Sequence, residues 1–404
     1  MRFPQLNNRN IVTVIHPADP LGPKVGGVES FIKGIIKYAP SNFTFFYIGV
    51  TSDNNIRKVR ILQKIELDGK SIYFYPLFIE ENENIKSLVP LSLRFTLFLL
   101  FHLKLIPKSV LFFNRIEPAI LFLKWKSKKV FVIHNDMLKQ LKKGNSEVLW
   151  SNFPKLYYFL ESIILDKFNF IFSVNINSLN FYNKRYPKLK NKMKFIPTWV
   201  DSKVFFPLNV EKSELIKNRL EKEFKIITSN GPWVLFVGRL QLQKAPMKLV
   251  ETFLEFREKN DNAVLIIVGD GNLRGQLECY VDKHNLRNCV YLLGNLTQMI
   301  VADFYRASDV FVLTSNFEGM PISVLEALGS GLPVVSTCVG EVERVITAGF
   351  SGEIAYSGTV EELTNSINKV VINRERYSKV NCVSSIAEFV PEKVLNDLYE
   401  KLNN

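Results

Sequence analysis

The chain has 404 residues, of which 47% are apolar and 20 are glycine, so it is long enough for two packed domains and too apolar to be disordered. Its four cysteines, Cys279, Cys289, Cys338 and Cys382, lie far apart in the sequence. They indicate neither a zinc site nor a disulfide framework, which is typical of a protein from a reducing cytoplasm.

The net charge of +13 is concentrated in the first half of the chain. Residues 1–200 hold 30 Lys+Arg against 13 Asp+Glu, whereas residues 201–404 hold 22 against 26. A basic half can meet nucleic acid, anionic lipid or an acidic substrate. No zinc finger, RNP-like aromatic motif or basic helical arm is present, so nucleic acid is not an expected partner.

The start of the chain and its most apolar stretch argue against insertion in a membrane. Residues 1–10 are polar, and no signal peptide is expected. The segment 88–106 is broken by Arg94, His102 and Lys104, and its longest uninterrupted run, 95–101, is far shorter than the ~20 residues of a membrane span. We expect a cytoplasmic protein that can lie at the inner face of the cell membrane as a peripheral protein, with an anionic membrane surface as a partner.

Short apolar runs alternate with amphipathic segments of helix length along the whole chain, a pattern that predicts parallel sheets covered by helices. In chain order, the predicted strands are 11–16, 43–50, 109–114, 129–134, 170–174, 194–197, 233–240, 263–271, 290–294, 309–315 and 333–337. Helical patterns occupy 247–259, 273–284 and 299–307, and a last helix begins at Pro391.

The predicted architecture is α/β, with two Rossmann-like doubly wound domains. The basic N-terminal domain spans residues 1–200 and the C-terminal domain spans 201–385, while 386–404 form a terminal helix that returns towards the N-terminal domain. In such sheets ligands bind at the carboxyl ends of the strands, so the loops that follow strands are the candidate site.

Two of these loops suit an anion. Gly26 and Gly27 precede a helix that begins near Val28, where backbone N–H groups can approach a phosphate, although an ordinary helix start explains them equally well. Arg239 and Lys244 follow the strand 233–240 and precede another helix, a suitable place for a diphosphate. Two basic residues in one loop are also compatible with simple solvation.

The third loop carries two carboxylates eight positions apart, Glu318 and Glu326. Pro321 pre-sets the first turn of a helix, so Glu318 lies before that helix and Glu326 within it. At 1.5 Å per residue the two are separated by ~12 Å, roughly the reach from a nucleotide's ribose to the sugar it carries. A glutamate favoured by the helix dipole, with a second one by chance, explains each residue singly but not the companion loops.

The frame "EGMPISVLEALGSGLPVVST" resembles the E-x7-E signature of the family 4 glycosyltransferases, retaining enzymes with the GT-B architecture of two Rossmann-like domains facing each other across a cleft. The likeness covers nearly the whole chain from Ile11. It also includes "GGVES" from Gly26, "IPTWVD" from Ile196, "FVGRLQLQKAP" from Phe236, "VGDGNLRGQL" from Val268, "YLLGN" from Tyr291 and "SGEIA" from Ser351.

The resemblance implies a role for each candidate residue. In the C-terminal domain, Glu318 and the amides of Gly319 and Met320 would hold the donor sugar, Glu326 would bind the ribose, and Arg239 and Lys244 would stabilise the departing diphosphate. In the N-terminal, acceptor-binding domain, Gly26 and Gly27 would lie against the phosphates and His134 near the sugar. His16 ends a strand in the same way as His134 but lacks the family context.

Some positions depart from the family pattern. Thr198 and Trp199 replace a frequent Asn-Gly, and Met320 and Pro321 replace a frequent Phe-Gly, which leaves the identity of the sugar open. No Asp-x-Asp motif is present, so catalysis without a metal is expected, with Arg239, Lys244 and helix amides neutralising the leaving group.

The predicted function is that of a retaining glycosyltransferase, a hexosyltransferase. It would move a sugar from a UDP-sugar, or a GDP-sugar, to a hydroxyl of a glycan or lipid-linked acceptor in bacterial surface polysaccharide or glycolipid synthesis, with no further cofactor. A dinucleotide-dependent oxidoreductase fails on spacing, because Arg274 occupies the third glycine position of the "GDGNLRG" segment. A nucleotide-sugar-binding protein or epimerase that transfers nothing to an acceptor remains open.

Overall fold

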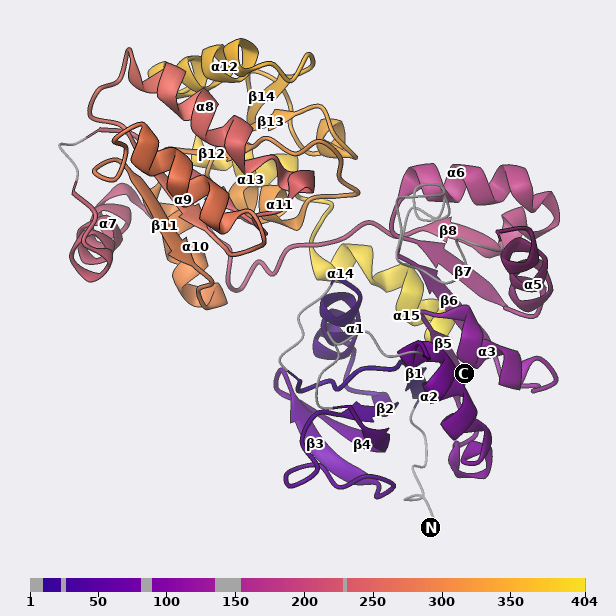
Figure 1. The fold of residues 1–404 in the computed structure, drawn as a ribbon. Helices are drawn as coiled ribbons and strands as arrows, with labels where there is room; N and C mark the ends of the chain where they lie inside the picture. Colours follow the sequence, from indigo (N-terminus) through magenta and orange to yellow (C-terminus); the bar gives the residue numbers. More distant parts are fainter. Residues whose placement is uncertain (1–9, 23–26, 81–88, 135–153, 228–230, 404) are drawn as a thin grey trace. The chain divides into compact units, whose positions relative to one another are not determined.

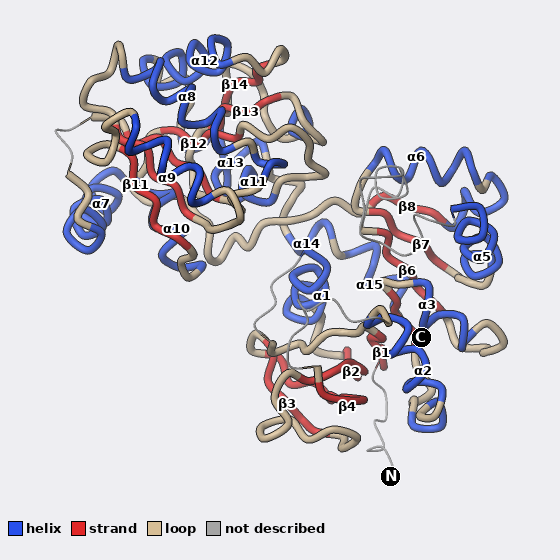
Figure 2. Tube along the Cα trace, in the orientation of Figure 1, coloured by secondary structure: helices blue, strands red, loops and turns tan. Residues whose placement is uncertain are grey.

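A computed structural model describes residues 10–22, 27–80, 89–134, 154–227 and 231–403. The chain divides into two compact units. The first comprises Met1–Pro197 together with Val394–Asn404, and the second comprises Thr198–Lys393 (Figure 1). In each unit a sheet lies between helices on its two faces (Figure 2).

The first unit contains an eight-stranded sheet in the order β3-β4-β2-β1-β5-β6-β7-β8. The strands are β1 (Asn10–Ile15), β2 (Phe43–Thr51), β3 (Gln63–Leu67), β4 (Lys70–Ile79), β5 (Val110–Phe113), β6 (Lys129–Ile133), β7 (Phe170–Ser173) and β8 (Met193–Phe195). All neighbours pair in parallel except β3 and β4, which form an antiparallel hairpin at the edge.

The hairpin β3–β4 is absent from the sequence prediction. Its two-residue turn consists of Asp68 and Gly69, both with positive φ (48° and 78°). Asp-Gly between two alternating segments is a strong hairpin signal, because this turn requires φ > 0 at both central residues. β3 is an edge strand with polar residues and exposed positions, so it lacks the buried, continuous apolar run that marks the predicted strands.

Helices cover both faces of the first sheet. On one face α2 (Leu91–Leu100), α3 (Ile116–Ala119), α5 (Pro154–Asp166) and α6 (Ile176–Arg185) pack against the strands in a single apolar core. On the other, α1 (Gly27–Tyr38) is joined to α15 (Asn396–Leu402), where the Tyr399 hydroxyl donates to Ile35 O at 2.8 Å. The end of the chain forms two short helices, α14 (Pro391–Val394) and α15, rather than the one predicted helix.

The second unit contains a six-stranded, wholly parallel sheet in the order β11-β10-β9-β12-β13-β14. The strands are β9 (Trp233–Val237), β10 (Val264–Val268), β11 (Val290–Gly294), β12 (Val310–Leu313), β13 (Val334–Thr337) and β14 (Gly352–Ala355). The five strands predicted for this half are confirmed, and β14 was missed.

Two apolar cores fill the two sides of this second sheet. One contains α8 (Pro246–Arg257), α9 (Arg274–Lys283) and α12 (Val360–Ile372). The other contains α7 (Val210–Phe224), α10 (Gln298–Ala307), α11 (Ile322–Gly329) and α13 (Lys379–Ser385). Numbered within the unit, the strand order is 3-2-1-4-5-6, which reverses direction between β9 and β12. In sheets of this topology, ligands bind at the carboxyl ends of the two strands where the order reverses. In the described ranges, no helix combines the length and apolar character needed to cross a membrane.

Candidate functional site

The loops that follow β9 and β12 meet at the switch point of the second sheet. The Thr314 hydroxyl donates to Lys244 O at 3.0 Å, and Asn316 N donates to Gln243 O at 2.8 Å. These contacts bring together the predicted loop that holds Arg239 and Lys244, the cation loop, and the predicted loop that holds Glu318, the carboxylate loop. The two loops therefore form one surface at the place where the topology predicts a ligand.

A contact ion pair lies at the centre of this surface. Lys244 Nζ is 2.7 Å from Glu318 Oε1, and the two side chains are only 17% and 8% exposed. The Ser315 hydroxyl donates to the same carboxylate oxygen at 2.7 Å, and Gln243 Nε2 donates to Oε2 at 3.3 Å. Arg239, at the start of the cation loop, is exposed. Neither Ser315 nor Gln243 was predicted, although Ser315 precedes Glu318 by only three residues.

A backbone hydrogen bond and a close backbone contact hold the segment of Gly319 and Met320 in place. Glu341 N donates to Gly319 O at 3.0 Å, and the preceding Gly340 has a φ of 58°. A Cβ at Gly340 would stand 1.9 Å from Gly319 O, so only glycine permits this approach. The amides of Gly319 and Met320 thus lie in a braced turn just before Pro321 and the start of α11.

Glu326 occupies the second turn of α11 and is half-buried. The Tyr305 hydroxyl, from α10, donates to Glu326 Oε2 at 3.1 Å. Burial raises the pKa of Glu326 to about 7, and the hydrogen bond from Tyr305 opposes that rise. Tyr305 was not predicted, since a tyrosine in an amphipathic helix resembles any other core residue.

The glycines of the "GDGNLRG" segment have a packing role. Gly269 has a φ of 133°, and a Cβ there would stand 2.0 Å from Gly238 O. A Cβ on Gly271 would stand 2.4 Å from Leu240 O. The loop after β10 thus lies directly against the backbone of the cation loop after β9. This close approach explains the glycines without a dinucleotide.

In the first unit, His134 directly follows β6 and contacts the end of β5. Its Nε2 lies 2.6 Å from Asn114 Oδ1, and its ring meets the Phe31 ring edge-on at a centroid distance of 4.9 Å. His16, at the end of β1, is 1% exposed and places Nε2 3.4 Å from Glu29 Oε1 on α1. The strand-end histidines and Asn114 therefore belong to one cluster at the carboxyl edge of the first sheet.

The surroundings keep His134 neutral. Burial lowers the pKa of His134 to about 3, helped by His16 and Arg115 and opposed by Glu29. A neutral imidazole donates from one ring nitrogen and accepts at the other. The Asn114 amide faces Nε2, and the tautomer of His134 decides which ring nitrogen donates. Asn114 and Glu29 were not predicted.

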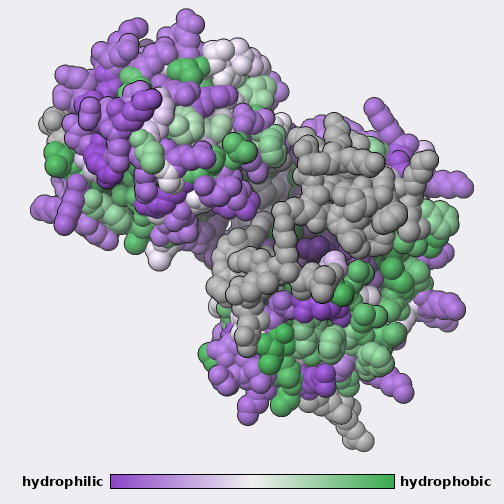
Figure 3. Space-filling view, in the orientation of Figure 1, coloured by the Kyte–Doolittle hydropathy of each residue, from purple (hydrophilic) through white to green (hydrophobic). Residues whose placement is uncertain are grey.

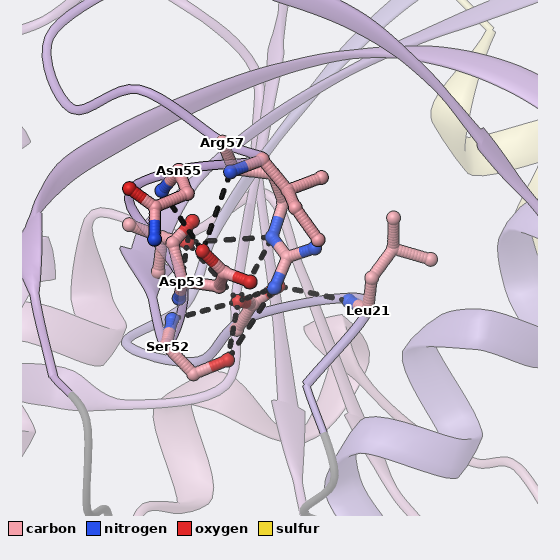
Figure 4. A network of polar contacts seen from close by, with 8 residues as sticks. Leu21, Ser52, Asp53, Asn55 and Arg57 are labelled. Atoms are coloured by element: carbon pink, nitrogen blue, oxygen red, sulfur yellow. Dashed lines mark hydrogen bonds and ion pairs between the residues drawn. The ribbon is translucent and has the colours of Figure 1, made fainter.

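The loop after β1 is fixed at its start by a buried carboxylate, Asp19. Its partners Leu21, Ser52 and Arg57 are labelled in Figure 4. Arg57 Nη2 lies 2.8 Å from Asp19 Oδ2, and Ser52 N donates to the same oxygen at 2.8 Å. Leu21 N donates to Oδ1 at 3.0 Å. Asp19 thus ties the loop that leads towards the glycine pair to the end of β2.

Of the predicted glycine pair, Gly26 lies outside the described residues, whereas Gly27 is the first residue of α1 and is exposed. A Cβ added to Gly27 would meet no described atom within 4 Å. The predicted residues Arg239, Lys244, Glu318, Gly319, Met320 and Glu326 share one edge of the second sheet, while Gly27 and His134 belong to the first unit.

Most of the second unit matches a known family of proteins. Residues 218–382, which include the cation loop, the carboxylate loop and Glu326, match the family model of the glycosyl transferases group 1. The resemblance seen in the sequence is confirmed at this level.

Curated relatives carry similar segments. An uncharacterized glycosyltransferase of Methanocaldococcus jannaschii is 31% identical over 213 residues, 52% of this chain and 48% of the relative. The UDP-Gal:alpha-D-GlcNAc-diphosphoundecaprenol alpha-1,3-galactosyltransferase of Escherichia coli is 31% identical over 182 residues, 44% of this chain and 45% of the relative. The matched segments thus span about half of each relative.

Solved structures match over the full length. Sucrose-phosphate synthase from Thermosynechococcus elongatus superposes with a TM-score of 0.74, covering 98% of this chain and 99% of the other at 16% identity. Anabaena HepE in complex with UDP and glucose gives 0.71, with coverage of 97% and 98% at 15% identity. The predicted α/β class with two GT-B-type parallel-sheet domains is confirmed.

Proposed function

We propose that the protein is a retaining, metal-independent glycosyltransferase that moves a sugar from a nucleoside-diphosphate sugar to a hydroxyl of a glycan or lipid-linked acceptor. The observation that carries this proposal is the switch-point site of the group 1 domain. There Lys244, Glu318 and Glu326 lie on adjoining loops and one helix at the carboxyl edge of the second sheet.

In the proposed reaction, the C1–O bond to the diphosphate breaks and a new bond forms between C1 and the acceptor oxygen on the same face of the sugar. Arg239 and Lys244 bind the diphosphate as its charge grows, and Lys244 exchanges Glu318 for a phosphate oxygen. The released Glu318, with the amides of Gly319 and Met320, binds the sugar hydroxyls. The acceptor's proton moves to the leaving phosphate.

The remaining residues bind and orient. Glu326 accepts hydrogen bonds from the ribose hydroxyls at the far end of the nucleotide, with Tyr305 holding its carboxylate. From the first unit, the amide of Gly27, at the start of α1, and that of Gly26 are proposed to approach the phosphates. His134, neutral and oriented by Asn114, offers a hydrogen-bonding nitrogen to the sugar without adding positive charge.

The donor and the acceptor are proposed from chemistry and from relatives together. HepE has been solved with UDP and glucose, and the E. coli relative acts with UDP-Gal on a diphosphoundecaprenol acceptor. A UDP-sugar is therefore the first donor to test, with GDP-sugars second. A lipid-linked acceptor and a peripheral position at the cytoplasmic face of the membrane also suit the net charge of residues 1–200.

A nucleotide-sugar epimerase or binding protein is the second candidate, because it would use the same nucleotide contacts. The two differ in product, since only a transferase attaches the sugar to an added acceptor. A thermal-shift panel of UDP-, GDP- and ADP-sugars comes first, and mass spectrometry of products formed with lipid extracts follows. Failure of every nucleotide to raise the melting temperature would remove the basis of the proposal.

A further inference from the structure

Helix α2 of the first unit is apolar on the side that faces away from the core. Its inner side, with Ser92, Phe95 and Leu99, is buried. On the outer side Leu97 is 60% exposed, and Phe101, which caps the helix, is 82% exposed. Leu100, 48% exposed, shares this outer side, whereas the Phe98 ring packs against Phe78 at a centroid distance of 4.8 Å. Contiguous apolar residues at such exposure mark an interaction surface in a soluble protein.

A groove lined by lysines, the lysine groove, lies near the residues that follow α2. It has a volume of about 740 Å³ and lies where β5 and β6 begin. Its lining includes Lys108, Lys126, Lys128 and Trp125. Lys108 and Lys126 are exposed, while the Lys128 ammonium donates to Asn403 O. Lys108 lies seven positions after Phe101, so the groove and the outer side of α2 belong to neighbouring stretches of the chain. Hydrophobic residues gather on the visible face of the first unit (Figure 3).

The segment 91–129, which holds α2 and the lysine groove, is strongly basic. Residues 91–129 contain eight Lys and Arg residues against a single acidic residue, Glu117. Glu117 is buried and accepts a hydrogen bond from the Ser92 hydroxyl at 3.1 Å. The surface around the outer side of α2 therefore offers exposed ammonium groups next to exposed Leu and Phe side chains and no exposed carboxylate from this segment.

We propose that the outer side of α2 and the lysine groove together form a docking surface for an anionic lipid bilayer. Leu97, Leu100 and Phe101 enter the interface between headgroups and acyl chains. Lys108 and Lys126 bind lipid phosphates at the groove, and Trp125 supplies the ring that favours this depth.

The same charges argue against a second copy of the chain as the occupant. A two-fold contact brings together two copies of the same surface, and the segment 91–129 of neither copy supplies an exposed carboxylate to pair with the other's lysines. An anionic leaflet instead attracts every exposed cation on the surface. The positive charge of this surface therefore favours an anionic bilayer over a second copy of the chain as its partner.

The docking surface also leads towards the place where the acceptor is expected. Arg94, in the first turn of α2, pairs with Glu80, which directly follows β4, at 2.9 Å. Helix α2 thus runs from the carboxyl edge of the first sheet to the lysine groove at the opposite edge. This inference rests on the proposed function only for the lipid-linked acceptor, and vesicle binding itself requires no nucleotide.

Flotation of the full-length protein with phosphatidylcholine vesicles, with and without phosphatidylglycerol, tests the surface. We expect binding only to the anionic vesicles and a fall in binding with added salt. Lys108→Glu with Lys126→Glu should weaken partitioning at least ~tenfold, because each lysine near an anionic leaflet contributes about fivefold. Phe101→Ser should weaken it about tenfold through lost apolar burial.

Matched controls come from the second unit. Ile372 is 77% exposed, and Lys259 and Lys283 are exposed on the same unit. Ile372→Ser and the pair Lys259→Glu with Lys283→Glu should leave flotation unchanged. Thermal unfolding of every variant shows whether weaker flotation comes from a changed surface or from unfolding. Substitutions at exposed positions should leave the unfolding midpoint nearly unchanged.

Three results would overturn the docking surface: no flotation with anionic vesicles at low salt, unchanged flotation of both α2-region variants, or lipid-free dimerisation that Phe101→Ser abolishes. UDP titration in the same samples separates the two proposals. A protein that binds UDP but no vesicles refutes the docking surface alone, whereas one that binds vesicles but no nucleotide refutes the proposed function alone.

Discussion

Lys244 Nζ and Glu318 Oε1 lie 2.7 Å apart, so the cation proposed for the diphosphate and the carboxylate proposed for the sugar form a contact pair. With both side chains largely shielded, each charge is balanced mainly by the other. A diphosphate that draws Lys244 away also releases Glu318 towards the sugar. In the proposed reaction, this contact would couple binding of the leaving group to binding of the reacting sugar.

Removal of either cation should slow sugar transfer strongly. Lys244→Ala and Arg239→Ala are each expected to lower kcat by ~10²–10³, because each removes a preorganised charge from the leaving diphosphate. Lys244→Ala should also raise KM, since it leaves Glu318 as an uncompensated anion near the phosphates. Steady-state kinetics measures both effects.

The same assay tests the metal-free mechanism. EDTA should leave the wild-type rate unchanged, because side chains and helix amides bind the diphosphate. Loss of activity in EDTA with recovery on addition of Mn²⁺ or Mg²⁺ would refute this part of the proposal.

The two glutamates should differ in their kinetic effect. Glu318→Gln is expected to lose more kcat than Glu326→Gln, since Glu318 contacts the sugar where charge develops and Glu326 anchors the ribose. Glu326→Gln should act mainly on KM for the donor. Equal losses confined to KM for both variants would contradict these roles.

Donor binding should depend on pH through Glu326. The pKa of this carboxyl is raised to about 7, so below that pH it is mostly protonated and accepts hydrogen bonds less well. Binding through the carboxylate favours the ionised form, so affinity for UDP should rise about tenfold per pH unit up to about 7 and level off above it. Calorimetric titration across this range gives the profile.

Glu326→Gln is the control for that profile. The glutamine variant should bind UDP more weakly than wild type above pH 7, with a pH profile flatter by the contribution of this one group. A wild-type affinity that rises as pH falls would show that the protonated acid is the binding form.

The strand-end histidine His134 should remain neutral throughout the physiological range. Its pKa is lowered to about 3, chiefly by burial. NMR of labelled histidine should show no titration of His134 between pH ~5 and ~8. A transition near the ordinary histidine pKa of ~6.5 would contradict the burial and hydrogen bonding described for this side chain.

The core and five of the six strands of the second unit follow closely from the sequence. Its strands are continuous runs such as "VLIIV" and "VVST", and its helices bury one side. Such patterns distinguish strand from helix well, because strands buried on both faces admit almost no polar residue. The carboxyl ends of β9 and β12 then identify the loops that hold Arg239, Lys244 and Glu318.

The partners of those residues were less predictable. Tyr305 reaches Glu326 from another helix, and Asn114 reaches His134 from the neighbouring strand, at separations of 21 and 20 residues. Such contacts depend on tertiary packing, which a local pattern does not contain. The Asp68–Gly69 turn was a readable signal that was overlooked, while the break between α14 and α15 has no glycine or proline at the junction to mark it.

The buried pair of Asp19 and Arg57 should stabilise the first unit. Asp19→Ala leaves Arg57 without its carboxylate, and both side chains are almost fully buried, so the free energy of unfolding should fall by ~3–5 kcal/mol. Asp53→Ala, which removes only an acceptor for the exposed amides of Asn55 and Ile56, should cost ~1 kcal/mol. Denaturant unfolding followed by fluorescence measures both variants, and equal costs would contradict the assignment.

Transfer itself tests the central claim most directly. Wild-type protein is incubated with a UDP-sugar that stabilises it and with extracted lipid acceptors, and products are measured by mass spectrometry, with Lys244→Ala as the inactive control. We predict free UDP and a glycosylated acceptor in equal amounts, with the donor's anomeric configuration retained. An epimerised nucleotide-sugar, or UDP release with no glycosylated acceptor, would contradict the account.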